Sequence, residues 1–248
     1  MSSLFGRVIM KSEKKKYIIL NRNQLNIFDS LLYDGSIKKY IDKKKNLRYS
    51  EHSGYLDFTV TNLFDRIIVS AITNREDYDD KDILLPYDLY DSYKYKYLFH
   101  THPPTLGRLA NNIIYEFPSV DDIFHFIDHY NMGNTIGSII IAPEGIYILY
   151  PNDFSIKKIK YDIELENEII SELNEGLFNI QDIAIQKYGK QFTKETFYNT
   201  IALDNTYIKL YNKLVNKFFD NQLKIVIEHR SLDKIANKWI IKKLYLPI

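Results

Sequence analysis

The feature that most constrains the fold of this chain is a predicted strand that ends at two prolines and is followed by a predicted helix with a capping motif. Residues 95–102 alternate in the manner of a strand, and Pro103 and Pro104 end it because neither can donate a hydrogen bond to a sheet. Ser119, with Asp122 three residues later, is the signature of a helix start, where the two side chains satisfy free amides reciprocally. Apolar residues continue at helical spacing after it: Ile123, Phe124, Ile127 and Tyr130.

Three possible metal ligands lie in this strand and helix. His100 and His102 are two residues apart, so in a strand both imidazoles point to the same face. Asp122 supplies a third ligand, and three protein ligands leave one tetrahedral position for water, as in catalytic zinc sites. A purely structural histidine pair and a purely capping Asp122 are the alternatives. Capping does not exclude ligation, because the helix dipole favours the ionised carboxylate that a metal requires.

Amide hydrolysis by a zinc-activated water also needs a base that accepts a proton and passes it on. Glu51 is the candidate, because it lies at or near the start of a predicted strand over residues 54–60. Taken alone, Glu51 is an ordinary surface acid. Together, Glu51-x-x-Gly54-x-Leu56, His100-x-His102-Pro103 and Ser119-x-x-Asp122 form an ordered set that resembles the JAMM motif of MPN+ metalloproteases.

The resemblance implies a role for each residue. His100, His102 and Asp122 correspond to the zinc ligands, Glu51 to the general acid/base, and Ser119 to the hydroxyl that helps to stabilise the oxyanion. The family hydrolyses isopeptide bonds of ubiquitin or ubiquitin-like conjugates, or peptide bonds in some prokaryotic members. It implies an MPN-type α/β fold, a mixed sheet flanked by helices, over residues 1–150.

The spacer between the histidines and the serine differs from the usual motif. Residues 103–118 form a longer connection than the family normally has, and its Tyr-Glu-Phe-Pro-Ser ending over residues 115–119 resembles JAMM proteins of large DNA viruses. We expect substrate specificity to lie in loops such as residues 105–116 and 79–91.

The other histidines fit a metal site less well. His52 alternates to the opposite face of its strand and is expected to be structural or exposed. His125 and His129 form an i, i+4 pair on the predicted helix, which is one way to bind a metal. Residue 126 is Phe, so the zincin pattern is absent, and a helix-face or supporting role is expected. His229 is expected in a remote helical segment.

The remaining pattern predicts strands over residues 5–10, 17–20, 66–72, 136–142 and 146–150. The first two are joined by a charged turn over residues 12–16, and residues 74–82 form an acidic exposed loop. A helix capped by Asn23 is expected to cover the sheet through Leu25 and Phe28. Gly133 ends the motif helix, and residues 143–145 make a hairpin turn.

From residue 151 the pattern becomes helical, over residues 163–177, 194–219 and 231–244. No Gly- or Ser-rich linker separates this part. We therefore expect residues 151–248 to be a helical extension packed on a catalytic domain of residues 1–150. MPN proteins commonly work in pairs or larger assemblies, so a homodimer or a larger complex is expected.

Composition excludes several classes of protein. With 248 residues the chain can bury a sizeable core, and the absence of cysteine excludes disulfides, thiolate metal sites and a cysteine-protease mechanism. A net charge of +1 argues against a nucleic-acid partner. No apolar run is long enough to cross a bilayer, and residues 1–10 lack the long apolar region of a signal peptide. We expect a soluble protein of the cytoplasm, or of the host cytoplasm or virion if it is viral.

The resulting hypothesis is an active zinc metallo-isopeptidase that resembles deubiquitinases. A non-catalytic MPN scaffold is one alternative, but such proteins have typically lost ligands that this chain retains. A zinc peptidase or amidase acting on a substrate unrelated to ubiquitin is the other alternative, and the sequence leaves it open.

Overall fold

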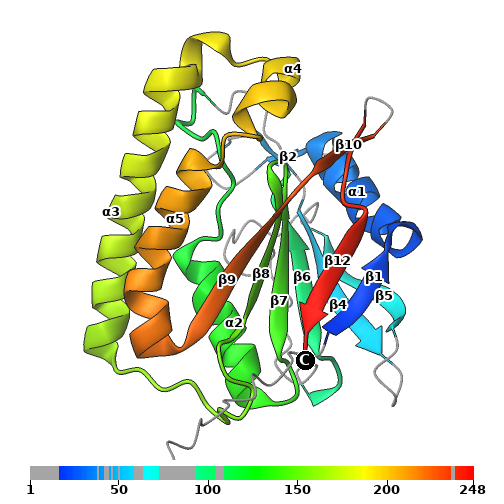
Figure 1. Ribbon diagram of the computed structural model, residues 1–248, viewed down its shortest axis with the longest axis vertical. Coiled ribbons are helices and arrows are strands. Elements are labelled where there is room, and N and C mark those ends of the chain that lie inside the picture. The colour runs from blue at the N-terminus through cyan, green and yellow to red at the C-terminus, as the bar shows by residue number, and fades with distance from the viewer. Residues whose placement is uncertain are drawn as a thin grey trace, which may run out of the picture.

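A six-stranded mixed sheet forms the centre of the molecule in the computed structural model (Figure 1). The structure describes residues 17–37, 39–41, 45, 47–49, 51–58, 64–72, 93–103, 109–235 and 238–248. Within them the strand order is β5-β4-β6-β7-β8-β9. The strands are β4 (His52–Phe58), β5 (Phe64–Ile72), β6 (Tyr97–Thr101), β7 (Gly137–Ala142), β8 (Gly145–Pro151) and β9 (Ile225–Ser231). Neighbouring strands are antiparallel except β6 and β7, which run parallel and are connected through helix α2 (Val120–Met132).

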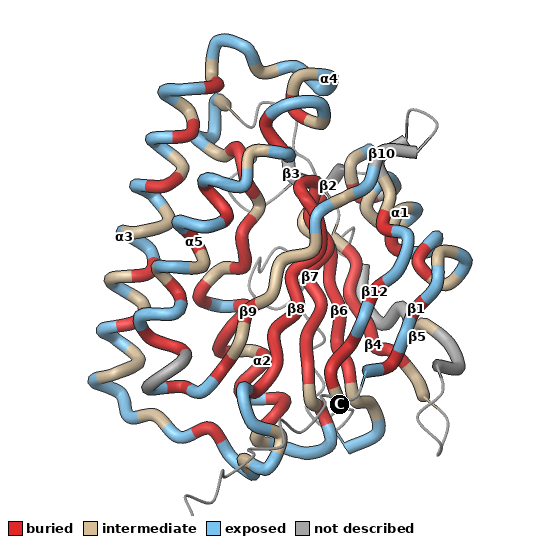
Figure 2. The backbone as a smooth tube through the Cα atoms, in the orientation of Figure 1, coloured by how far each residue is buried: buried red, intermediate tan, exposed pale blue. Residues whose placement is uncertain are grey.

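The sheet is covered on both faces, which is why β7 and β8 are buried along their whole length (Figure 2). Helices α2, α3 (Ile163–Tyr188) and α5 (Asn205–Phe218) cover one face and form one apolar core with residues such as Ile140 and Leu149. Helix α1 (Arg22–Ile37) and the two-stranded ribbon of β1 (Tyr17–Asn21) and β12 (Lys243–Pro247) cover the other face. Figure 1 shows these as three layers, with α3 and α5 on the left and α1 on the right.

Shorter elements complete the described part of the chain. They are the strand pairs β2 (Lys39–Ile41) with β3 (Leu47–Tyr49) and β10 (Asp233–Ile235) with β11 (Lys238–Ile240), the short helix α4 (Lys194–Thr196), the 3-10 turn Gly189–Gln191, and the π-helical turns Phe197–Ile201 and Phe219–Leu223. None of the described helices combines the length and the apolar character needed to cross a membrane.

The structure confirms the α/β class, and each strand predicted at the centre of the sheet has its counterpart there. The strand predicted over residues 17–20 is β1, and its partner is β12 rather than an earlier segment. The predicted strand 5–10, turn 12–16 and loops 74–82 and 79–91 lie outside the described residues. The capping role predicted for Asn23 is wrong, because α1 begins at Arg22 and Asn23 lies within its first turn. Membership of the MPN fold stays a prediction.

The helix predicted over residues 231–244 is wrong, because the described residues there form strands: Ile225–Ser231, Asp233–Ile235, Lys238–Ile240 and Lys243–Pro247. The apolar residues there do recur at helical spacing. However, β9 pairs with the edge of β8 along seven residue pairs, from Pro151↔Ile225 to Gly145↔Ser231. Pairing with a distant strand overrides the local pattern. The last strand of the main sheet therefore comes from beyond residue 150, and the helical part is confined to residues 163–223. Division at residue 150 into two domains stays a prediction.

Gly54 tests the close packing of β4 against β5. A Cβ atom at this position would lie 1.8 Å from the Ile68 carbonyl oxygen, a backbone atom that cannot move aside without opening the strand pair. We expect Gly54→Ala to lower the free energy of unfolding by about 2 kcal/mol or more, at the upper end of overpacking effects. Urea unfolding followed by circular dichroism measures this.

Gly189→Ala is the matched control. Its Cβ would meet nothing closer than 3.6 Å, and its φ of −53° is helical, so its unfolding midpoint should stay at or slightly above that of the wild type. Equal midpoints for both variants would contradict the strand register described above.

Candidate metal centre

His100, His102 and Asp122 converge on one point, with their ligand atoms within 4.8 Å of one another. The Nε2 atoms of the two histidines are 3.0 Å apart, and His100 Nε2 lies 2.9 Å from Asp122 Oδ1. His102 Nε2 lies 3.5 Å from Asp122 Oδ2. Among the described residues, no other group of three or more His, Cys, Asp or Glu side chains gathers in this way. This buried group could hold a metal ion.

Strand β6 and its extension hold the two histidines. His100 pairs with Ile140 of β7, and the His102 amide donates to the Ile141 carbonyl at 2.8 Å, which continues the pairing one residue beyond β6. The imidazole of His102 is fixed as well, because its Nδ1–H donates to the Glu116 carbonyl at 3.1 Å. With the proton assigned to Nδ1, the Nε2 lone pair is left for a metal.

The start of α2 places Asp122. Ser119 caps this helix: its Oγ accepts from the Asp122 amide at 3.2 Å, and Asp122 Oδ2 accepts from the Ser119 amide at 2.6 Å and from its hydroxyl at 2.8 Å. The predicted capping box is therefore confirmed. Because capping uses Oδ2 while Oδ1 faces His100, the same carboxylate can cap the helix and bind a metal.

The charges at the site depend on one another. Burial lowers the pKa of His100, although Asp122 acts in the opposite direction. Burial also opposes a charge on His102, but Asp122, together with Glu51 and Glu116, outweighs it and raises the pKa of His102 to about 10. Burial acts to raise the pKa of Asp122, yet the two histidines hold it well below its usual value. An ionised carboxylate beside two imidazoles is a donor set that suits a divalent cation, which would replace the proton on His102.

Glu51 interacts electrostatically with this group. It precedes β4 by one residue, and the pairing of β4 with β6 extends to Ser53 and His100. The His52 amide, between Glu51 and Ser53, donates to the Thr101 hydroxyl at 3.0 Å and fixes this corner of the sheet. Glu51 is half-buried, and its charge acts on His102. Its role as a base stays a prediction.

The histidines on the same helix lie near the site but outside the group of three. The rings of His125 and His129 meet edge to face with centroids 4.4 Å apart, and His129 is fully buried. Burial, with His129 and His100 nearby, lowers the pKa of His125 to about 3. A supporting role rather than ligation agrees with this geometry. His52 is buried, as a structural residue would be.

His229 does not lie in a helix, contrary to the sequence prediction. It is on β9, where its ring packs on Tyr147 at 4.9 Å and its Nε2–H donates to the Glu144 carbonyl at 3.3 Å. The error has the same cause as the wrong helix over residues 231–244, because the edge of β8 fixes this segment as a strand.

Two contributions to the site were missed by the sequence reasoning. The Glu116 carbonyl orients His102, and the Glu116 carboxylate acts on the charge of His102. Every residue has a main-chain carbonyl, so no residue type in the sequence could have identified the Glu116 carbonyl as the partner of His102. The Glu116 side chain stands in the Tyr-Glu-Phe-Pro-Ser run, but nothing in that run shows that it folds back on His102.

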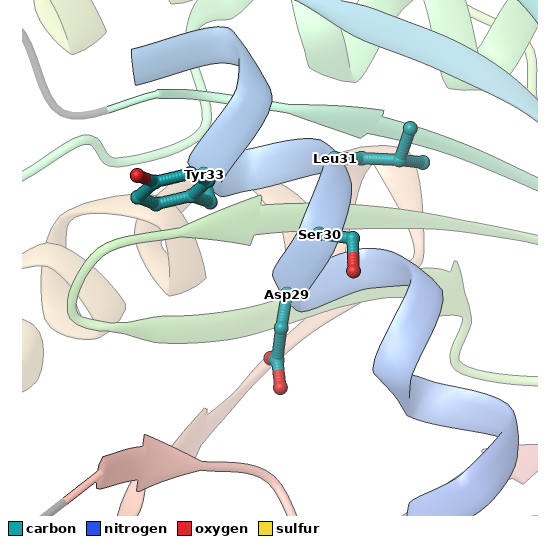
Figure 3. A pocket seen from close by; sticks show the side chains of 4 residues that line it. All are labelled: Asp29, Ser30, Leu31 and Tyr33. Atoms are coloured by element: carbon teal, nitrogen blue, oxygen red, sulfur yellow. The ribbon is translucent and has the colours of Figure 1, made fainter. Parts of the chain in front are cut away.

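A hollow of about 480 Å³ lies elsewhere, on α1, and is lined by Asp29, Ser30, Leu31 and Tyr33 (Figure 3). All four residues come from one helix. Helix α1 packs on the sheet face that carries Phe99, whereas His100 points to the other face. The hollow is therefore separate from the candidate metal centre.

Comparison with known proteins gives one informative relative. No family model and no solved structure matches this chain. The chain is 36% identical over 242 residues to "Uncharacterized protein R413" of Acanthamoeba polyphaga mimivirus, a match that covers 93% of this chain and 65% of the relative. The chain thus spans about two thirds of the length of that relative. The similarity suggests a viral origin, and the His-His-Asp group is compatible with the JAMM motif without being diagnostic of it.

Asp122 provides a direct test of the metal centre. We expect the wild type to bind one divalent metal ion per chain, and Asp122→Asn to weaken binding at least 100-fold because the buried anionic ligand is lost. Isothermal titration and elemental analysis after reconstitution measure this. Asp121→Asn removes the adjacent, exposed carboxylate of the same helical turn and should bind as the wild type does. Equal affinities for the two variants would place the metal elsewhere.

His229 makes the stability of the fold depend on pH. Burial lowers its pKa to about 4, below the usual value of about 6.5, so the unfolded chain binds more protons between these two pH values. The contribution of neutral His229 to the free energy of unfolding is fully present above about pH 6.5 and is lost as the pH falls toward about 4. The His229→Gln variant can still donate a hydrogen bond to Glu144. Between pH 7 and pH 4 we expect its free energy of unfolding to fall by on the order of 2–3 kcal/mol less than that of the wild type. Urea unfolding of both proteins from pH 7 to pH 4 measures the difference, and parallel curves would contradict it.

Proposed function

We propose that this chain is a zinc-dependent hydrolase of the JAMM type that cleaves isopeptide bonds in ubiquitin or ubiquitin-like conjugates. The observation that carries the proposal is the convergence of His100, His102 and Asp122 on one point, with the charge of Glu51 acting on His102. Three segments far apart in the sequence contribute these residues, in the order of the motif.

The donor set favours zinc. Two imidazoles and one carboxylate are the ligand types of catalytic zinc sites, and cysteine is absent from the chain. When bound, zinc lowers the pKa of a coordinated water toward neutrality and polarises a carbonyl group. His100 and His102 would hold the ion through Nε2, and Asp122 through Oδ1, the oxygen that the helix cap does not use.

Glu51 and Ser119 have different duties in this proposal. Glu51, partly exposed and with its charge acting on His102, accepts the proton of the attacking water and passes it to the leaving amine. The Ser119 hydroxyl donates to Asp122 and so orients that ligand first. To stabilise an oxyanion, the Ser119 hydroxyl must give up its hydrogen bond to Asp122 and donate to the substrate oxygen instead. The hydrogen bond from the Ser119 backbone amide to Asp122 Oδ2 would still keep the carboxylate in place.

The substrate class rests on the resemblance of the ordered motif, and one feature favours a second candidate. The spacer over residues 103–118 is longer than in the usual motif, so the protein that this site accommodates can differ from ubiquitin. A zinc peptidase acting on another substrate uses the same residues in the same roles. A non-catalytic scaffold is disfavoured, because each position of the motif holds the residue type that its role needs.

Replacing Glu51 separates chemistry from metal binding. Glu51→Gln keeps the size of the side chain but loses the base, so turnover should fall by roughly 10²–10⁴-fold while zinc content and fold are retained. Fluorogenic ubiquitin conjugates and isopeptide-linked ubiquitin chains serve as substrates at matched zinc occupancy.

Glu116→Gln is the matched control, because Glu116 also acts on the charge of His102 but is not assigned the proton transfer. It should keep most of the turnover. The reverse result would assign the base to Glu116. If the zinc-loaded protein cleaves unrelated peptides and no ubiquitin conjugate, the isopeptidase part of the proposal fails and the peptidase remains. If it cleaves nothing, the hydrolase proposal fails.

A further inference from the structure

The segment of residues 114–119 makes the final approach to the metal centre without secondary structure of its own. It provides the Glu116 carbonyl that orients His102, and it ends at Ser119, which caps α2 and holds Asp122. The backbone groups of residues 114–118, which precede α2, need partners from elsewhere, because these residues lie in no helix or strand. The precision of the metal centre therefore depends on what holds this segment.

Helices α3 and α5 supply those partners. On α3, Gln181 Oε1 accepts from the amides of Ile114 and Tyr115 at 2.9 and 3.2 Å, and its Nε2 donates to the Tyr115 carbonyl. On α5, the Tyr211 hydroxyl donates to the Pro118 carbonyl at 3.1 Å. These bonds hold the segment at both ends.

Aromatic packing fixes the segment between them. The Phe117 ring stacks on Tyr211 with centroids 4.7 Å apart and an angle of 2°, and on Tyr115 at 5.3 Å and 17°. Tyr211 is fully buried, and Tyr147 of β8 packs on the cluster from the sheet side, where its ring and that of Phe117 are at 71° with centroids 6.2 Å apart. The Tyr115 hydroxyl donates to the Ile201 carbonyl at 2.8 Å, which adds a bond to the turn that precedes α5. The segment is therefore packed between the sheet and helices α3 and α5.

We propose that α3 and α5 act as a brace for the metal centre, and that Gln181 and Tyr211 are positioning residues for metal binding. This inference rests on the proposed metal centre. Among the described residues, neither side chain hydrogen-bonds to or stacks on His100, His102 or Asp122, and their hydrogen bonds go to residues 114–118. The charge of Asp122 does act on the Tyr211 hydroxyl. Loss of either would let the Glu116 carbonyl and the cap of α2 shift relative to β6. Partners of this indirect kind typically change metal affinity by about 10–100-fold.

Co²⁺ is the probe for the experiment, because its visible absorption reports both binding and ligand geometry. Tyr211→Phe removes one hydroxyl and keeps the stacked ring, and Gln181→Met removes the amide and keeps the length and helix propensity. We expect the Kd for Co²⁺ of the 248-residue chain to rise by roughly 10–100-fold in each variant, with a weaker or shifted absorption band at saturation.

Tyr188→Phe is the matched control. Its hydroxyl also links the helical pair, by donating to Asp204 at the start of α5, but among the described residues it makes no hydrogen bond to residues 114–119. It should bind Co²⁺ within about threefold of the wild type with an unchanged spectrum. Urea unfolding of the metal-free proteins tests whether all three variants are folded, and we expect cooperative transitions for each.

Three outcomes overturn the inference. They are unchanged Co²⁺ affinity in Tyr211→Phe and Gln181→Met, an equal loss in Tyr188→Phe, and no Co²⁺ binding by the wild type. A chain that binds Co²⁺ with the expected pattern but cleaves neither conjugates nor peptides would support the brace while the proposed hydrolase fails. The two failures are therefore distinguishable.

Discussion

The Asp122 carboxylate connects a helix to a strand, and each of its oxygens makes a different connection. Oδ2 closes the cap of α2 with Ser119, and Oδ1 lies against His100 on β6. The position of α2 along the sheet and the convergence of the ligands are therefore fixed by one buried group. An unpaired carboxylate would be costly at this depth. The fold tolerates Asp122 because the cap, the two imidazoles and the helix dipole all favour its charge.

The sequence predicted the parts of the site that depend on local geometry. His100 and His102 share a face because side chains alternate along any strand, and Ser119 and Asp122 meet because they are three residues apart at a helix start. Glu51 could be proposed only through the ordered motif, since nothing local shows that β4 pairs with β6 in the register that sets Ser53 opposite His100.

The sequence failed where distant pairing decides the structure. Residues 225–247 carry apolar side chains at spacings that suit a helix, but β9 completes the main sheet and β12 pairs with β1. The contribution of Gln181 and Tyr211 could not be predicted for a similar reason. Each side chain hydrogen-bonds to main-chain atoms more than 60 residues away, and every residue type has such atoms. The general class of the fold followed from periodicity, whereas the edges of the sheet and the support of the site did not.

The pairing of β1 with β12 has a practical consequence for handling the protein. Tyr17 lies opposite Pro247, and the buried Tyr97 hydroxyl at the start of β6 donates to the Pro247 carbonyl. The carboxyl-terminal strand is thus bonded directly to the strand that carries His100. It lies in the layer of α1, on the face of the sheet that His100 does not point to. A fluorophore or surface tether attached after Ile248 would leave the histidine face open, whereas deleting the last few residues would leave both β1 and the Tyr97 hydroxyl without their partners.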